Sequence, residues 1–163
     1  MKSGKVFCRK TEEALLAEKS FLDRAAEYTY KELERVGGDP LKLDLPQQTV
    51  AILYSVQGII DNGGFQYLFE NDFPHHPAYA RFVEAYRRIG ANAAAERLEK
   101  AVAMFPFKDP HLHQDHRLSF MDTMDEDSEF FELGNEVCGD EKVWADLEAY
   151  AKTNAASFPI SVN

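Results

Sequence analysis

The chain has 163 residues, of which 28 are acidic and 18 basic, so its formal net charge is −10 at pH 7. Its length suits one domain, and its 12 Phe and 7 Tyr residues supply the large apolar side chains that disordered chains lack. The negative charge argues against direct binding to nucleic acid or to an anionic membrane, because both would repel it.

The cysteines and the N-terminal segment indicate a cytoplasmic protein. Cys8 and Cys138 are far apart in sequence and do not resemble the dense cysteine frameworks of small secreted domains. The basic N-terminus lacks the apolar stretch of a signal peptide, and no apolar run approaches the roughly 20 residues that a membrane-spanning helix needs. We therefore expect a soluble cytoplasmic protein that does not contact a membrane.

The acidic excess is concentrated in one quarter of the chain. Residues 109–148 contain 13 acidic side chains and two basic ones, which gives this segment a net charge of −11. The remainder contains 15 acidic and 16 basic side chains and is nearly neutral. All of the negative excess therefore lies in residues 109–148.

Apolar residues recur at three- and four-residue steps along almost the whole chain, which is the spacing of helices. The first helix is expected to start near Thr11, a suitable N-cap, and to stop at the Gly-Gly-Asp-Pro sequence of residues 37–40. The second is expected from near Pro46 to the Asn-Gly-Gly sequence of residues 62–64. Further helices are expected over residues 65–70, 77–89, 92–105, 109–121, 130–137 and 143–150.

These elements predict an all-α fold, an irregular single-domain bundle of about seven helices. No internal repeat, low-complexity tract or long linker divides the chain. Residues 1–10 are expected to form a flexible N-terminal arm, residues 11–157 a single all-helical domain and residues 158–163 a C-terminal tail.

The sharpest local pattern is the segment 60–71, whose sequence is IDNGGFQYLFEN. A Gly-Gly pair can cradle a phosphate, but a P-loop needs a following Lys-Ser or Lys-Thr pair that this segment lacks. We expect instead a tight turn between two helices, with Asn62 or Gly63 at a positive φ and Gly64 allowing the two helix ends to approach closely. The residues of this structural signature are Asn62, Gly63, Gly64, Phe65, Gln66 and Asn71.

Residues 59–71 resemble the signature segment of a bacterial family of all-helical proteins that is typified by a small DNA-mimic protein. The resemblance continues through residues 86–91, the alanine-rich residues 93–103 and residues 104–106, and it covers roughly residues 45–153. It implies an all-helical fold whose acidic surface imitates DNA phosphates and occupies a DNA-binding regulator. Because the glycine signature is expected to be structural, any mimicry has to come from the acidic residues.

Six acidic residues follow one another at steps of three and four: Asp122, Asp125, Glu129, Glu132, Glu136 and Asp140. On one continuous helix they would fall within about 80° of each other, with no basic residue interleaved to relieve their repulsion. Their Cβ atoms would be about 5–6 Å apart, which is broadly comparable with neighbouring phosphates on one DNA strand. Gly134 weakens this segment as a helix, and Gly139 is a candidate end for it before Asp140.

With Glu126 and Asp127 added, these residues form the acidic face, the predicted protein-binding site. The expected partner is a basic DNA-binding protein, such as a dimeric helix-turn-helix regulator, and no direct binding to nucleic acid is expected. The alternative is a solvated face that keeps the protein soluble. An EF-hand count through the same segment fails, because Phe130 stands where that calcium loop requires glycine.

Three histidines, His111, His113 and His116, form the sequence HLHQDH, which is similar to the metal motif of metallo-β-lactamase-type hydrolases. Those folds need a β-sandwich and further histidine ligands, whereas this chain has no histidine after His116 and is helical on both sides. On a helix, His113 and His116 would share a face. We therefore expect no metal, no cofactor, no catalytic residue and no enzymatic activity.

Two other functions remain open. One is a zinc-dependent hydrolase that uses the three histidines. The other is an immunity-type inhibitor of a basic toxin or nuclease, which would share the electrostatics of the DNA mimic and differ in its partner.

Overall fold

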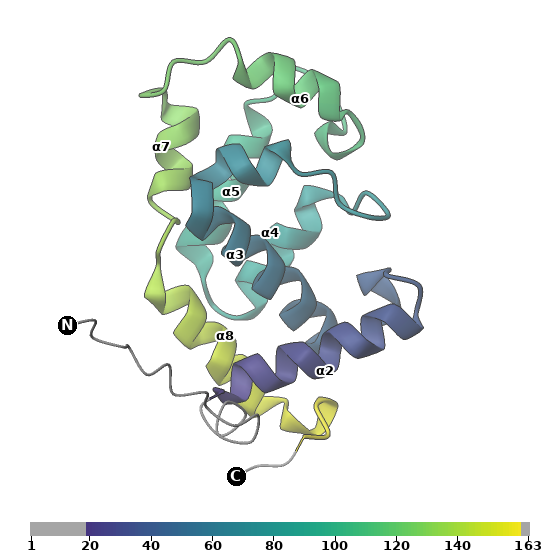
Figure 1. The fold of residues 1–163 in the computed structure, drawn as a ribbon. Coiled ribbons are helices and arrows are strands. Elements are labelled where there is room, and N and C mark those ends of the chain that lie inside the picture. The colour runs from purple at the N-terminus through teal and green to yellow at the C-terminus, as the bar shows by residue number, and fades with distance from the viewer. Residues whose placement is uncertain (1–18, 161–163) are drawn as a thin grey trace, which may run out of the picture.

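The long helix α3 (Leu45–Glu70) lies at the centre of the molecule, as the computed structural model shows for residues 19–160, the part of the chain that it describes (Figure 1). It packs against α2 (Phe21–Arg35), α4 (Tyr79–Arg88), α6 (Gln114–Met121), α7 (Glu129–Asn135) and α8 (Glu141–Thr153), whereas α5 (Asn92–Ala103) packs against α4 and α7. The 3₁₀ helices are η1 (Pro40–Lys42), η2 (Pro110–Leu112) and η3 (Ala155–Ser157). Residues 19–160 contain seven α-helices and no strand, which confirms the all-α prediction.

The two ends of the chain lie partly outside the described residues. The predicted arm over residues 1–10 and the helix start near Thr11 fall there, as do residues 161–163 of the predicted tail. Phe158 of that tail is buried in the core. No helix within residues 19–160 combines the length and the apolar character needed to cross a bilayer.

Helix α2 begins at Phe21, so the prediction of one helix running from Thr11 to the glycines at 37 and 38 is wrong at its start. Ser20 has extended backbone angles (φ −62°, ψ 164°) and acts as the N-cap. Its side-chain oxygen accepts a hydrogen bond from Asp23 N at 3.0 Å, while the Asp23 carboxylate accepts one from Ser20 N at 3.2 Å. This reciprocal pair satisfies two amide groups that have no partner at a helix start.

The helix predicted over residues 109–121 is divided in two. Asp109 takes left-handed backbone angles (φ 51°, ψ 53°) and is followed by η2. His113 (φ −129°, ψ 71°) then leaves the helical region, and α6 starts one residue later at Gln114. The predicted single helix is therefore a 3₁₀ turn followed by a shorter α-helix.

The core around the C-terminal half of α3 is built from aromatic rings. Phe69 is fully buried, and its ring lies 5.1 Å from that of Tyr79, 5.0 Å from that of Phe105 and 5.4 Å from that of Phe130, measured between centroids. Aromatic pairs at such distances contribute about 0.5–1.5 kcal/mol each beyond the area that they bury. Four separate segments of the chain therefore meet at Phe69.

A polar network holds the middle of α3 to α4 and to the region around the start of α8. The fully buried Gln57 accepts a hydrogen bond from Tyr86 Oη at 2.8 Å and donates from Nε2 to Val137 O at 3.0 Å and to Asp61 Oδ1 at 2.7 Å. The Asp61 carboxylate also accepts from Gly139 N at 2.8 Å and from Trp144 Nε1 at 2.7 Å. Burial raises the pKa of Tyr86, so its phenol stays protonated and can donate.

Arg117 of α6 is also buried, with 1% of its surface exposed. Its guanidinium donates to Phe69 O at 2.8 Å, to Asn71 O at 2.9 Å and to Pro110 O at 2.6 Å. Asp72 Oδ1 lies 3.8 Å away, and the centroid of the Tyr79 ring lies 6.0 Å from the guanidinium carbon. Arg117 therefore fixes the end of α3 against η2, and its charge is withdrawn from the surface.

We expect Arg117→Lys to lower the free energy of unfolding by about 3 kcal/mol, because a lysine ammonium cannot reach all three carbonyl groups and leaves buried acceptors without donors. Urea denaturation would measure the change. The control is Arg35→Lys on the surface of α2, which should change stability by less than about 0.5 kcal/mol. Equal midpoints for the two variants would show that Arg117 is not a structural link.

Candidate protein-binding face

The acidic face does not lie on one helix. Four of its members lie in the loop between α6 and α7: Asp122, Asp125, Glu126 and Asp127. We call this loop, residues 122–128, the acidic loop (Figure 1). The other four lie on or beside the next two helices: Glu129 and Glu132 on α7, Glu136 at its C-cap and Asp140 at the N-cap of α8. The prediction of a continuous acidic helix is therefore wrong.

The sequence of the acidic loop explains why it is not helical. Met124 is the only apolar residue between Met121 and Phe130, so a helix there would have no apolar stripe to pack on the core. Carboxylates three and four positions apart would also repel one another along such a helix. Ser128 has extended backbone angles (φ −68°, ψ 151°), and α7 starts after it. All four carboxylates of the acidic loop are exposed.

Two members of the acidic face are paired with cations of α5. The Glu129 carboxylate contacts Lys100 Nζ, and Glu136 Oε2 accepts a hydrogen bond from Arg97 Nε at 2.5 Å. Exposed ion pairs contribute about 0–1 kcal/mol each, but here they place positive charge beside the C-terminal part of the face. No basic residue is interleaved in the acidic row, but in the folded structure Lys100 and Arg97 of α5 relieve part of its repulsion.

The members of the acidic face that form no ion pair lie mainly in the acidic loop. Within residues 19–160, the other six members of the acidic face form no ion pair: Asp122, Asp125, Glu126, Asp127, Glu132 and Asp140. Asp140 is occupied as a helix cap, because its Oδ1 accepts a hydrogen bond from Lys142 N at 3.0 Å. The loop carboxylates and Glu132 are therefore the charges most available to a partner.

The glycine pair breaks α3 as predicted, although the roles of the residues differ. Gly64 has the positive φ (φ 62°, ψ −155°), in a region that is essentially restricted to glycine. Gly63 is extended in φ (−172°), and a Cβ on it would lie 2.2 Å from Cγ of Tyr67. The assignment of the positive φ to Asn62 or Gly63 is therefore wrong.

The close approach of two backbones at this break is made by a glycine of another helix. A Cβ on Gly134 of α7 would lie 2.4 Å from the backbone nitrogen of Phe65. From the sequence, Gly134 was expected only to weaken the helix. Its place between the apolar residues Leu133 and Val137 is the signal that could have identified it as a packing position.

The polar residues of the glycine signature make local contacts on either side of the break. Asn62 Nδ2 donates to Gly58 O at 2.6 Å, and Asn71 Nδ2 donates to Tyr67 O at 3.1 Å at the end of α3. Gln66 Nε2 donates to Glu70 Oε1 at 2.9 Å.

A pocket of about 210 Å³, which we call the kink pocket, joins the break in α3 to the acidic loop. It is lined by Gly63, Gly64, Phe65, Gln66, Glu126, Phe131 and Asn135. The structure therefore brings together two features that are about 60 residues apart in sequence and that no local sequence pattern connects. Phe131 and Asn135 were not among the predicted site residues.

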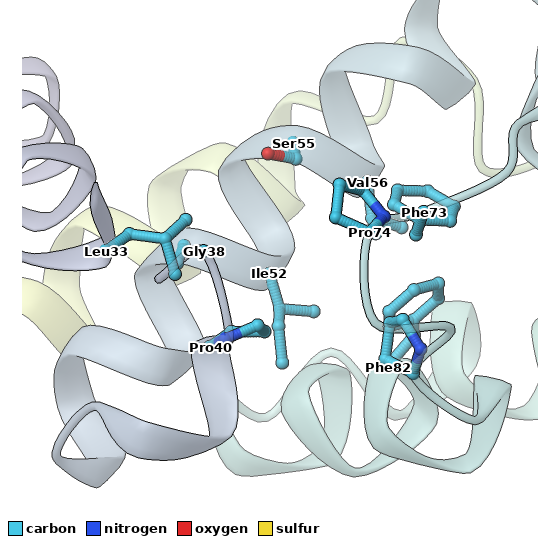
Figure 2. A pocket seen from close by; sticks show the side chains of 11 residues that line it. Leu33, Gly38, Pro40, Ile52, Ser55, Val56, Phe73, Pro74 and Phe82 are labelled. Carbon is cyan, nitrogen blue, oxygen red and sulfur yellow. The ribbon is translucent and has the colours of Figure 1, made fainter. Parts of the chain in front are cut away.

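A second pocket, of about 230 Å³, is apolar and belongs to another part of the molecule. Figure 2 shows Leu33 and Pro40 facing Phe73 across it, and Ser55 is its only side chain with a hydroxyl group. No charged residue and no member of the acidic face lines it. Beside it, a hydrogen bond of 2.8 Å joins His75 Nε2 to Gly37 O.

The three histidines of the HLHQDH sequence are only partly brought together. The rings of His113 and His116 stack with centroids 5.2 Å apart, so these two share a face as predicted, whereas the His111 ring lies against Tyr79. Burial lowers the pKa of His111, against a smaller opposing effect of Asp109. No group of three or more His, Cys, Asp or Glu side chains within the described part of the chain is placed to hold a metal ion.

The sequence model of one protein family, described as DMP19-like protein, matches residues 41–154. The matched range runs from η1 to the end of α8 and includes the broken helix, the kink pocket and the acidic loop. No curated protein and no solved structure matches the chain significantly.

We expect Gly64→Ala to lower the free energy of unfolding by about 1–3 kcal/mol, because alanine does not tolerate these backbone angles. The control is Gly58→Ala in the same helix, where a Cβ meets no atom within 4 Å and where alanine should stabilise the protein by up to about 1 kcal/mol. Thermal unfolding of both variants tests the assignment. A Gly64→Ala variant as stable as Gly58→Ala would contradict it.

Proposed function

The chain belongs to the DMP19-like protein family, and from this premise we propose that it is an acidic protein-binding module that acts as a DNA mimic. In this function it occupies the nucleic-acid-binding surface of a basic DNA-binding regulator. The observation that carries the proposal is the acidic loop, which presents four exposed carboxylates within six consecutive residues and without an ion pair to the described chain. The family resemblance supports mimicry as the mode of binding.

The electrostatics of the loop suit this function. The Lys and Arg side chains that contact phosphates on DNA would meet carboxylates here, and opposite charge steers such partners into contact. A regulator bound in this way is unavailable to DNA, so competition follows from the concentrations and affinities of the two ligands.

The ion pairs made by α5 limit the part of the acidic face that is available to a partner. Lys100 and Arg97 offset the charges of Glu129 and Glu136, so the contact with a basic partner is centred on the acidic loop and Glu132. The partner is expected to be a dimeric helix-turn-helix regulator. A basic toxin or nuclease would satisfy the same electrostatics, and the identity of the captured protein distinguishes the two.

We expect the triple variant Asp125→Asn, Glu126→Gln, Asp127→Asn to bind the partner at least about tenfold more weakly, because it keeps the shape of the loop and removes three charges. The partner is captured from native lysate on the immobilised protein at low salt, eluted by a salt step and identified. Calorimetric titration at several salt concentrations then measures affinity. The slope of log affinity against log salt should be shallower for the variant, since exposed charges are screened within about 8 Å at physiological ionic strength.

The matched control for this experiment is Glu27→Gln, Glu32→Gln, Glu34→Gln, which removes three charges from α2, outside the matched family range. It should retain wild-type affinity, and like the wild type it should displace a DNA fragment from the partner. Equal losses of partner affinity in the two triple variants would contradict the proposal, as would a wild-type affinity that does not change with salt. Either result would show that the acidic loop is an ordinary solvated surface.

We also propose that the protein is not an enzyme and that its histidines are dispensable. Replacement of His111, His113 and His116 with Gln should leave the melting temperature and partner binding unchanged. The measurement is the metal content of untagged protein by mass spectrometry, together with both assays. Stoichiometric zinc that disappears in the triple variant, with a loss of hydrolytic activity, would overturn this part of the proposal.

A further inference from the structure

The kink pocket has the size of a site for one side chain. Its volume of about 210 Å³ is below the range of about 300–1,000 Å³ that is usual for pockets holding drug-sized ligands. It opens beside the acidic loop, because Glu126 belongs to both. A protein partner docked on that loop would therefore have a pocket within reach of its side chains.

Hydrogen-bond acceptors from three elements line this pocket. Gln66 uses its Nε2 to donate to Glu70, which leaves its Oε1 as the free acceptor. Asn135 Oδ1 lies 3.5 Å from the position that a Cβ on Gly64 would take, so the amide oxygen faces the break. The Glu126 carboxylate has no ion pair within the described chain.

The remaining lining suits a flat cation. No Lys, Arg or His contributes to the pocket, and Phe131 supplies a half-buried aromatic ring. A guanidinium group has several N–H donors and no acceptor, it binds carboxylates in a two-pronged geometry, and it stacks on aromatic faces. An ammonium group is a point charge that uses fewer of these features.

We propose that the kink pocket binds an arginine side chain of the partner protein, with the guanidinium held by Glu126 and the Asn135 amide oxygen against the ring of Phe131. This assignment rests on the proposed function for the source of the arginine. The break in α3 also contributes to this site. Gly64 has no side chain, so the space in front of Asn135 stays open for the guanidinium.

The experiment titrates the ¹⁵N-labelled protein with N-acetyl-L-arginine amide and, in parallel, with N-acetyl-L-lysine amide. We expect saturable shifts at the backbone amides of Gly63, Gly64 and Asn135 with the arginine compound, and a weaker response to the lysine compound. Glu126→Gln should weaken arginine binding about tenfold, since it removes a charge-assisted hydrogen bond. The control is Asp115→Asn on α6, which removes one exposed charge away from the pocket and should leave binding within about twofold of wild type.

Two results would overturn the assignment. One is the absence of saturable shifts at the kink. The other is an Asp127→Asn variant that weakens arginine binding as much as Glu126→Gln, because that pattern indicates diffuse attraction by the acidic loop. The free amino-acid derivative needs no partner, so the pocket can fail while the loop still binds a regulator. Equally, the arginine compound can bind the pocket while the protein displaces no DNA from its captured partner, in which case only the proposed function fails.

Discussion

The packing of the C-terminal half of the chain depends on the break in α3 at Gly63 and Gly64. The break sends the helix on a new course, and Phe65 and Phe69 on its far side reach the aromatic core. Helix α7 can pack closely against the part of α3 after the break, because Gly134 has no side chain that would clash with Phe65. The backbone carbonyl of Phe69 in turn binds the buried guanidinium of α6. The backbone conformation at Gly63 and Gly64 therefore determines where α6 and α7, the helices on the two sides of the acidic loop, are placed.

The acidic loop can be exposed and irregular because the elements on both sides of it are anchored. Met121 at the end of α6 and Phe130 at the start of α7 are both buried in the core. Between these points Met124 is the one residue of the acidic loop that packs against the hydrophobic cluster, so the repulsion between the loop carboxylates disfavours helical order and leaves the core packing intact. Binding residues on loops that a rigid scaffold positions are a common arrangement in proteins. The pairing of α5 cations with Glu129 and Glu136 limits where along this surface a basic partner is attracted most strongly.

Local sequence signals predicted the fold class, most of the helices and the break at the glycine pair, because each depends on neighbours within a few residues. Which glycine takes the positive φ was not predictable, since Gly63 and Gly64 both lack the side chain that would restrict φ. The spacing of the acidic residues suggested a helix, but a helix in a globular protein also needs an apolar stripe, and only Met124 is available. The cations that pair with the acidic face lie 29 and 39 residues away in sequence, so they appear only in the folded structure. From the sequence, Arg117 was only one of the two basic side chains of residues 109–148, and its burial depends on the carbonyl groups of Phe69, Asn71 and Pro110.

The hydrogen bond from the Trp144 indole to Asp61 has a consequence for observing this protein in solution. Trp144 is the only tryptophan in the chain, and its ring lies edge-on to that of Tyr54 with centroids 5.5 Å apart. Its fluorescence therefore senses the junction of α3 and α8, where excitation absorbed by Tyr54 is also transferred to it. The side chains that contact this ring pair, Asp61, Asp23 and Tyr30, lie outside the acidic loop, so we expect the emission spectrum to follow unfolding of the scaffold. The protein thus contains an intrinsic optical probe that separates unfolding from events at the binding surface.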